Sequence, residues 1–399
     1  MRAVDSGLHS RWILELGFLP ASSGSCSVRA LPLEGITIVS LEQAVAAPLC
    51  TRHLAELGGR VIKIERPGEG DFARSYDTKV KGMSSHFVWT NRSKESLALD
   101  LKDARDFSVL EKLLKRTDVL VQNLAPGAAD RMGLSYKALR EQYPTLIVCN
   151  ISGYGPSGPY QHKKAYDLLV QSEAGVLSVT GTESEPVNSI LAALIKRGKT
   201  GHGCEIDISM LESMVEWMGF PLYYAYDGAE GPRPAGASHA SIYPYGPFKT
   251  GSNKSIMLSV QNEREWVKFC DEILEDGSIA TDQRFCNNTL RSQNRVVLKE
   301  IISEVVMERL DKAGIANATV NGMKEVWNHP QLKERGRWTE VDTPNGRISA
   351  LLPPGSRSLE EVRMSAIPSV GQQNDAILEE LGITDSKAEI CSSIRKLGT

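Results

Sequence analysis

A regular alternation of short β-branched runs with stretches of helical spacing constrains the fold most, and it begins at Leu33. Residues 36–40 form a short apolar run, residues 46–57 place apolar side chains at helical spacing, and residues 61–64 are β-branched again. A strand, a helix and a second strand in this order close as a right-handed crossover with parallel strands. Because buried parallel strands need helices on both faces, this unit predicts a layered α/β domain.

The alternation continues along the chain. Further extended segments are expected at residues 96–100, 119–121, 146–151 and 205–208, and further helices at 107–115, 136–142, 210–218, 266–274, 296–310 and 372–381. No internal repeat accompanies them. The pattern therefore predicts an α/β fold, with a doubly wound parallel-sheet large domain plus a smaller α/β domain.

Composition suggests how the chain is divided. Residues 1–30 interleave arginine with serine, which is typical of organelle transit peptides and favours the mitochondrial matrix, with the cytoplasm as the alternative location. Because Asp5 and Glu15 do not fit a transit peptide, a disordered extension is the alternative for this segment. Glycine, proline, serine and tyrosine crowd residues 227–251, where we expect a domain crossing. The predicted parts are the extension at 1–30, a large domain at 31–222 and 331–399, and a small domain at 223–330.

The charge and the cysteine content limit which partners and ligands we expect for this chain. A formal net charge of −3 and a pI near 6.2 give no general attraction for nucleic acid or for an anionic membrane. No apolar stretch approaches the ~18–20 residues that a membrane-spanning helix needs. Seven scattered cysteines without CxxC spacing predict neither a disulfide framework nor a zinc site. We therefore expect no nucleic acid, no membrane and no metal.

Ligands of open parallel sheets bind outside the carboxyl ends of the strands. The segments that follow the first predicted strands, at 41–44, 65–68, 122–127 and 152–155, are rich in polar or glycine residues. Arg66 lies in one of them, where a guanidinium binds phosphate well and where Gly68 and Gly70 allow the backbone to approach an anion. Taken alone, an exposed turn with a solvated arginine is the simpler interpretation.

Several short motifs occur together in a specific order. They are Leu-Glu-Gly at 33–35, Gln-Ala at 43–44, Val-Ile-Lys-Ile-Glu-Arg-Pro at 61–67, Asn-Arg-Ser-Lys at 91–94, Leu-Asp-Leu-Lys at 99–102, Asn123 with Pro-Gly at 126–127, Arg-Met-Gly-Leu at 131–134, Ile-Ser-Gly-Tyr-Gly at 151–155 and Gly-Lys-Thr-Gly at 198–201. This series resembles the class III CoA-transferases of the CaiB/BaiF type. That family includes formyl-CoA transferase and the succinyl-CoA-dependent dicarboxylate transferases, and the resemblance implies an interlocked homodimer.

The resemblance also implies acyl-coenzyme A as a substrate. Family contacts to the nucleotide and pantetheine of CoA carry over to Gln43, Ala44, Arg66, Leu99, Lys102, Asn123, Arg131, Lys164 and Tyr166. A mildly acidic protein needs a few fixed cations to hold this anionic ligand, and four of these residues are cations. For Ala44 and Leu99, simple packing is the alternative.

The catalytic segment departs from the family pattern. The family uses an Asp carboxylate that attacks the thioester and forms an enzyme-bound mixed anhydride, while the CoA thiolate stays bound. No aspartate lies between Asp167 and Asp207, and the family has about one helix more between Val187 and Ser189. Glu183 and Glu185 match no catalytic position. We infer a deletion, by splicing or gene prediction, and assign no catalytic residue.

The resemblance gives a weaker indication of the acyl substrate. Residues 236–248 occupy the glycine or histidine loop of the family, where His239 either hydrogen-bonds an acyl carboxylate or caps a turn. With residues 261–266, this loop resembles that of transferases acting on succinate, itaconate, mesaconate or glutarate. An acyl-CoA racemase is disfavoured, because Tyr166, with a usual pKa near ~10, is a poor base at neutral pH.

Three hypotheses stay open. The first is a CoA-transferase that moves CoA from an acyl-CoA such as succinyl-CoA to a small dicarboxylate. The second is a CoA-binding pseudoenzyme or inactive isoform, because the nucleophile is not matched. The third is a subunit that only dimerises with a complete paralogue.

Overall fold

The computed structural model describes residues 30–162, 170, 186–218, 222–223, 225, 230–231, 236–239, 242–249, 255–302, 307–356 and 358–383. The chain divides into two units, Met1–Ala30 and Leu31–Thr399. Of the first unit only Ala30 is described, so the predicted extension lies outside the described residues. The strands of the large sheet are β1 (Thr37–Leu41), β2 (Arg60–Glu65), β3 (Lys94–Ala98), β4 (Val119–Gln122), β5 (Ile147–Ser152) and β6 (Glu205–Ser209).

These six strands form one parallel sheet in the order β3-β2-β1-β4-β5-β6. The order reverses between β1 and β4, which pair at Ile38 with Val119. This arrangement confirms the predicted doubly wound fold. It also places a topological switch point, the usual ligand position of such sheets, between the loops that follow β1 and β4.

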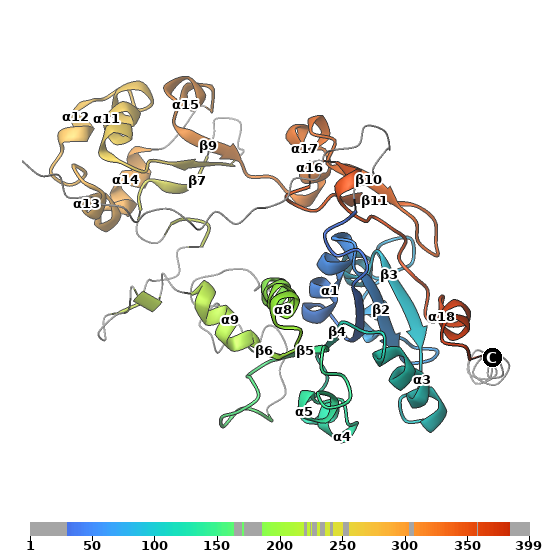
Figure 1. Ribbon diagram of the computed structural model, residues 1–399. Coiled ribbons are helices and arrows are strands. Elements are labelled where there is room, and N and C mark those ends of the chain that lie inside the picture. The colour runs from blue at the N-terminus through green and yellow to red at the C-terminus, as the bar shows by residue number, and fades with distance from the viewer. Residues whose placement is uncertain are drawn as a thin grey trace, which may run out of the picture. The chain divides into compact units, whose positions relative to one another are not determined.

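Helices cover both faces of this sheet. They are α1 (Ala46–Glu56), η1 (Phe72–Ser75), α2 (Ser85–Thr90), α3 (Ala104–Leu114), α4 (Ala128–Arg131), α5 (Tyr136–Leu139), α8 (Pro186–Thr200), α9 (Met210–Trp217) and α18 (Asn374–Glu380). Side chains alternate along β1, so Ile38 packs with α1 and α8 while Val39 packs with α3 and α18. Figure 1 shows these two pairs of helices on opposite sides of the sheet. The two apolar cores explain why the central strands are almost continuously hydrophobic.

Several predicted elements differ from the observed ones in their bounds, and for two of them the structure gives the reason. The segment expected at 96–100 is β3 at Lys94–Ala98, because Lys94 and Ser96 are buried polar residues that an apolar pattern does not reveal. The helix expected at 136–142 is α5, which ends at Leu139. There the last turn tightens, and Gln142 N donates to Leu139 O at 3.1 Å.

A second sheet is antiparallel and has its own core. Its strands are β7 (Tyr245–Lys249), β8 (Ser255–Ser259) and β9 (Ala316–Thr319), and its helices are α11 (Glu263–Glu272), α12 (Ser278–Thr281), α13 (Asn288–Gln293), α14 (Arg295–Ile301) and α15 (Met307–Ala313). Trp266, Phe269 and Phe285 are buried in this core, which confirms a smaller α/β part. The continuous helix predicted over 296–310 is wrong. Ile302 leaves the helical conformation (φ −82°, ψ 61°) and is itself buried.

The last described segment returns to the large sheet. It follows α16 (Met323–Trp327), α17 (Pro330–Glu334), the hairpin of β10 (Trp338–Val341) with β11 (Ile348–Leu351), and η3 (Leu359–Glu361). At the edge strand β3, Ser96 N donates to Gln373 Oε1 and Ala98 N donates to Asn374 Oδ1, both at 2.8 Å. The free edge of β3 is therefore covered by residues from the far end of the chain.

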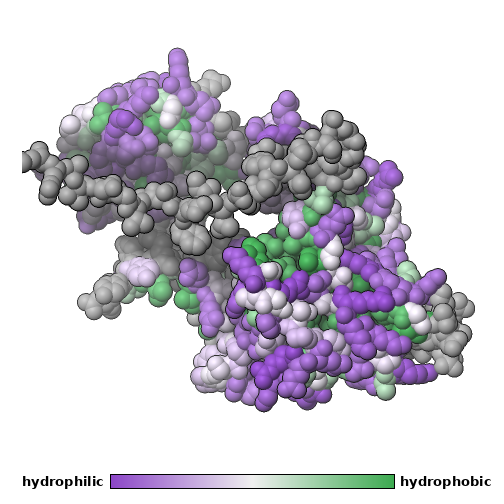
Figure 2. Space-filling view, viewed as in Figure 1, coloured by the Kyte–Doolittle hydropathy of each residue, from purple (hydrophilic) through white to green (hydrophobic). Residues whose placement is uncertain are grey.

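The surface seen in Figure 2 is mostly hydrophilic around the six-stranded sheet. Among the helices that the structure describes, none is long and apolar enough to cross a membrane.

Candidate functional site

The loops after β1 and β4 contact each other at the switch point. Gln43 N donates to Asn123 Oδ1 at 2.9 Å, and Asn123 Nδ2 donates back to Gln43 O at 2.9 Å. Both residues were predicted to contact coenzyme A, and the structure brings them together. A pair of reciprocal bonds fixes both loops at the position where sheets of this topology bind ligands.

Ala44, the next residue, has a left-handed backbone with φ of 64°. A non-glycine residue adopts this conformation only at a cost, so the surroundings must hold it. Ala44 N donates to Asp71 Oδ1 at 3.1 Å, and Phe72 N donates to Gln43 Oε1 at 3.3 Å. The turn at Gln43 and Ala44 is thus bound to the segment that follows β2.

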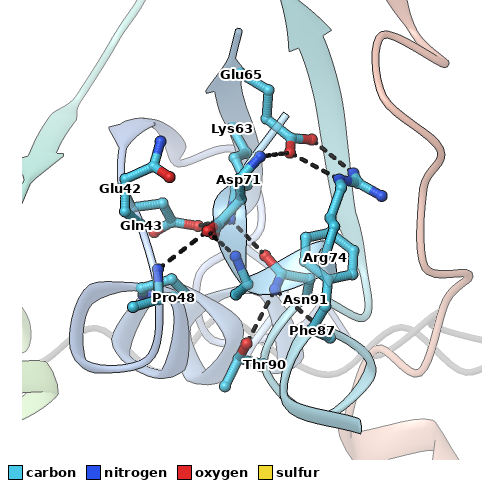
Figure 3. Close-up of polar contacts among 12 residues, drawn as sticks. Glu42, Gln43, Pro48, Lys63, Glu65, Asp71, Arg74, Phe87, Thr90 and Asn91 are labelled. Carbon is cyan, nitrogen blue, oxygen red and sulfur yellow. Dashed lines mark hydrogen bonds and ion pairs between the residues drawn. The ribbon is translucent and has the colours of Figure 1, made fainter. Parts of the chain in front are cut away.

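A buried polar network lies beneath this turn (Figure 3). Lys63 Nζ lies 2.6 Å from Asp71 Oδ2 and donates to Asn91 Oδ1 at 3.0 Å. Lys94 Nζ lies 2.7 Å from Glu42 Oε1 and donates to Pro48 O at 2.8 Å. The charged side chains are at most 1% exposed, so each charge depends on its partner.

The electrostatics of the network keep Glu42 and Lys94 ionised. Burial raises the pKa of the Glu42 carboxyl, but the ammonium groups of Lys94 and Lys63 offset this, so its pKa lies below the usual value. Burial lowers the pKa of Lys94 to about 8, against the opposing charge of Glu42. At neutral pH, both partners are charged.

Glu65, at the end of β2, extends this network. Its carboxylate accepts from Arg74 Nε at 2.9 Å and Nη2 at 2.7 Å, from Ser96 Oγ at 2.6 Å and from Asp71 N at 2.9 Å. Burial raises the pKa of Glu65, but hydrogen bonds from Arg74 and the charge of Lys63 lower it more, to about 2.

Glu65 is expected to make the protein sensitive to acid. Because its folded-state pKa is depressed, its stabilisation is complete above the usual value of about 4.5 and is lost as the pH falls through about 2. In Glu65→Gln, the loss of unfolding free energy between pH 5 and pH 2 should be smaller by about 2–3 kcal/mol. Urea unfolding across this range measures it. Glu111→Gln, at an exposed site on α3, is the control, and an unchanged acid dependence in Glu65→Gln would contradict the assignment.

The predicted cations lie at loop ends on the same edge of the sheet. Arg66 follows β2, Lys102 follows β3 and Arg131 follows β4, and all three side chains are exposed. The Arg66 side chain is 74% exposed and lies 3.2 Å from Glu69. Because β3, β2, β1 and β4 are neighbours, these residues and the Gln43 turn follow adjacent strands. Three exposed cations therefore follow strands on the edge of the sheet that also carries the Gln43 turn.

Not every residue that was predicted to contact coenzyme A exposes its side chain. Leu99 is 2% exposed and packs in the core beneath α3, so any ligand contact is left to its backbone. Its N donates to Glu65 O at 2.9 Å. Lys164 and Tyr166 lie outside the described residues.

His239 caps a turn before β7. Its Nδ1 accepts from Ile242 N at 3.0 Å, its N donates to Tyr245 O at 2.9 Å, and its ring stacks on Tyr245 at 5.2 Å between centroids. The Tyr243 carbonyl in the same turn accepts from the buried Arg291 at 3.0 Å. The capping interpretation therefore describes the observed contacts, and an acyl contact stays a prediction.

Sequence reasoning missed the buried network of Glu42, Lys63, Asp71, Asn91 and Lys94. The available signal was Lys63, a lysine inside the otherwise apolar run of residues 61–64, because a lysine at such a position is buried only when it is paired. Among the described residues, no group of three or more His, Cys, Asp or Glu side chains is placed to hold a metal ion.

Known proteins resemble this chain over most of its length. A sequence model described as CoA-transferase family III matches residues 33–374. Succinyl-CoA:glutarate CoA-transferase of Homo sapiens is 32% identical over 387 residues, which cover 90% of this chain and 87% of that protein. Succinyl-CoA:mesaconate CoA-transferase of Haloarcula hispanica is 29% identical over 387 residues, covering 88% and 96% of the two chains.

Solved structures agree with this result. A CaiB/BaiF family protein from Brucella suis has a TM-score of 0.75 and 28% identity, with 88% of this chain and 100% of that chain covered. The Mycobacterium tuberculosis protein Rv3272 has a TM-score of 0.74 and 25% identity, with coverage of 88% and 99%.

The human alignment contains a length difference. The alignment spans 387 positions. It includes 90% of the 399 residues of this chain, which is about 359 residues. About 28 positions of the human protein therefore have no counterpart in this chain.

Proposed function

Because this chain belongs to CoA-transferase family III, we propose that it binds acyl-CoA at the edge formed by the loops after β1, β2, β3 and β4. The observation that carries this proposal is the switch point, where Gln43 and Asn123 hydrogen-bond each other between the loops that follow β1 and β4. The phosphates of coenzyme A would lie against Arg66, Lys102 and Arg131, with Gln43 and Ala44 facing the pantetheine end.

The reaction of the lineage is transfer of CoA from succinyl-CoA, or a similar donor, to a small dicarboxylate. Support comes from relatives named for succinyl-CoA with glutarate or mesaconate, at about 30% identity. In this mechanism, an Asp carboxylate displaces the CoA thiolate from the thioester and forms a mixed anhydride. The acceptor carboxylate then attacks the aspartyl carbonyl and expels the donor carboxylate, which leaves as the free acid. The CoA thiolate attacks the acyl carbon of the new anhydride, which forms the acceptor's CoA thioester and regenerates the Asp carboxylate.

A second candidate is coenzyme binding without turnover. No aspartate lies between Asp167 and Asp207, and α8 already begins at Pro186, next to the predicted deletion. The roughly 28 unmatched positions of the human relative fit the loss of one segment.

Other features belong to the same proposal. They are a homodimer, a mitochondrial location with the cytoplasm as the alternative, and domain boundaries near residues 222 and 330. An assembly with a complete paralogue is the remaining alternative, and co-purification of a second transferase chain would support it.

Coenzyme binding is tested by charge reversal at Arg66. Arg66→Glu is expected to raise the Kd for free CoA about 10- to 100-fold, because it replaces a phosphate-binding cation by a repelling carboxylate. Isothermal titration calorimetry measures the Kd. Arg284→Glu is the matched control, since Arg284 is also an exposed arginine paired with a nearby carboxylate, that of Asp282.

Two outcomes would contradict the binding proposal. One is an unsubstituted chain without measurable affinity for CoA or succinyl-CoA. The other is an Arg66→Glu variant with the affinity of the Arg284→Glu control. Turnover is measured separately, by incubation with succinyl-CoA and a labelled acceptor and by trapping of the anhydride with hydroxylamine.

A further inference from the structure

We propose that Asp71, held by Lys63, is a positioning residue that fixes the left-handed turn at Ala44 for coenzyme A. This inference rests on the proposed function, because the ligand is the coenzyme of that site. Neither Asp71 nor Lys63 is among the predicted coenzyme contacts. Both are buried beneath the loops that carry those contacts.

The first step of the argument is the bonding of the Asp71 carboxylate. Oδ1 accepts from Ala44 N at 3.1 Å and from Ala73 N at 2.9 Å, and Oδ2 accepts from Lys63 Nζ at 2.6 Å. The side chain is fully buried. A carboxylate held by these three donors is fixed in one orientation, so it couples the position of β2 to that of the loop after β1.

The second step concerns backbone strain. A φ of 64° at Ala44 is costly for a residue with a Cβ, so without its bond to Asp71 the turn would relax towards ordinary conformations. Gln43 would then lose its place beside Asn123 and Phe72. A site that must reorder before binding has a lower affinity, in proportion to the fraction of molecules in the competent state.

The third step is that Asp71 connects two parts of the site. It ends the loop that carries Arg66, and Asp71 N donates to Glu65 Oε1 at 2.9 Å, which fixes that loop to β2. Gly70 has φ of 69°, and a Cβ there would lie 2.8 Å from Glu65 Oε1, so the backbone before Asp71 has little freedom. Asp71 therefore sets the phosphate-binding arginine and the Gln43 turn relative to each other.

Asp71→Asn tests the proposal, because asparagine keeps the shape but offers one acceptor oxygen for Ala44 N, Ala73 N and Lys63 together. The Kd for free CoA, measured by calorimetry, is expected to rise about 10-fold. Amide hydrogen exchange should quicken in peptides covering residues 41–49. If this variant does not fold, Lys63→Met with Asp71→Leu removes both charges and the acceptor for Ala44 N, leaves Glu42 paired with Lys94, and carries the same expectation.

Ala44→Gly provides a rescue that a merely structural role would not allow. Glycine adopts positive φ without the Cβ penalty, so in the Asp71→Asn background it should recover at least about 3-fold of the lost affinity.

Glu56→Gln is the matched control. Glu56 is a buried carboxylate at the end of α1, paired with Arg52 and Arg92 and not with the Gln43 turn. It should lower thermal stability without changing CoA affinity or exchange in residues 41–49. If the folded Asp71→Asn variant binds CoA with the Kd of the unsubstituted chain, this inference is wrong while the proposed function stands. The same holds if Ala44→Gly restores no CoA affinity in the Asp71→Asn background. Loss of CoA binding by the unsubstituted chain overturns the proposed function as well.

Discussion

Insertion at Asn188 of the segment that we infer to be deleted, copied from human succinyl-CoA:glutarate CoA-transferase, is expected to raise CoA transfer from succinyl-CoA to glutarate by at least about 10³-fold. The inserted segment would supply the Asp nucleophile that the lineage needs and that residues 168–206 lack. Chromatographic measurement of glutaryl-CoA tests this expectation. The gain should be in turnover, because the coenzyme loops are already present.

The same insertion with its aspartate replaced by asparagine is the control. Both inserted proteins should bind CoA, and only the aspartate version should form a product and a hydroxylamine-sensitive intermediate. If the chain without the insertion transfers CoA as fast as the inserted version, the interpretation of a deleted nucleophile is wrong.

Replacement of Lys63 by methionine is expected to lower the free energy of unfolding by about 3–5 kcal/mol. Lys63 Nζ lies 2.6 Å from Asp71 and 3.7 Å from Glu42, and all three side chains are buried. Removal of the Lys63 ammonium group leaves the buried Asp71 carboxylate without its charged partner. Urea unfolding monitored by tryptophan fluorescence measures the change.

The double substitution Lys63→Met with Asp71→Asn separates charge from packing. It should recover more than half of the stability lost in Lys63→Met, because no uncompensated charge is left. A loss below about 1 kcal/mol in Lys63→Met would show that the pair is not buried as described.

Sequence reasoning located the sheet and the loops at its edge for a simple physical reason. Strands buried on both faces are apolar at nearly every position, as in residues 119–121 and 147–149, and a pattern of that kind is visible without a structure. In a parallel sheet all carboxyl ends lie on one edge. The loops carrying Gln43, Arg66 and Asn123 were therefore expected near one another before any contact was known.

The buried network could not be found in the same way. Lysine and glutamate at positions 42, 63 and 94 look like surface residues, and only the fold shows that they neutralise each other. The start of β3 was misplaced for the same reason. Leu99 shows the opposite case, since its apolar side chain belongs to the core although the family pattern suggested a ligand contact.

The hydrogen bonds from Gln373 and Asn374 to β3 join residues that lie 277 and 276 positions apart in the chain. On the ribosome, β3 is made long before its covering segment, so the nascent sheet keeps one unprotected border until synthesis is almost complete. In a chain truncated before residue 370, the edge of β3 would stay exposed permanently, and chaperones would bind it as an incompletely folded protein.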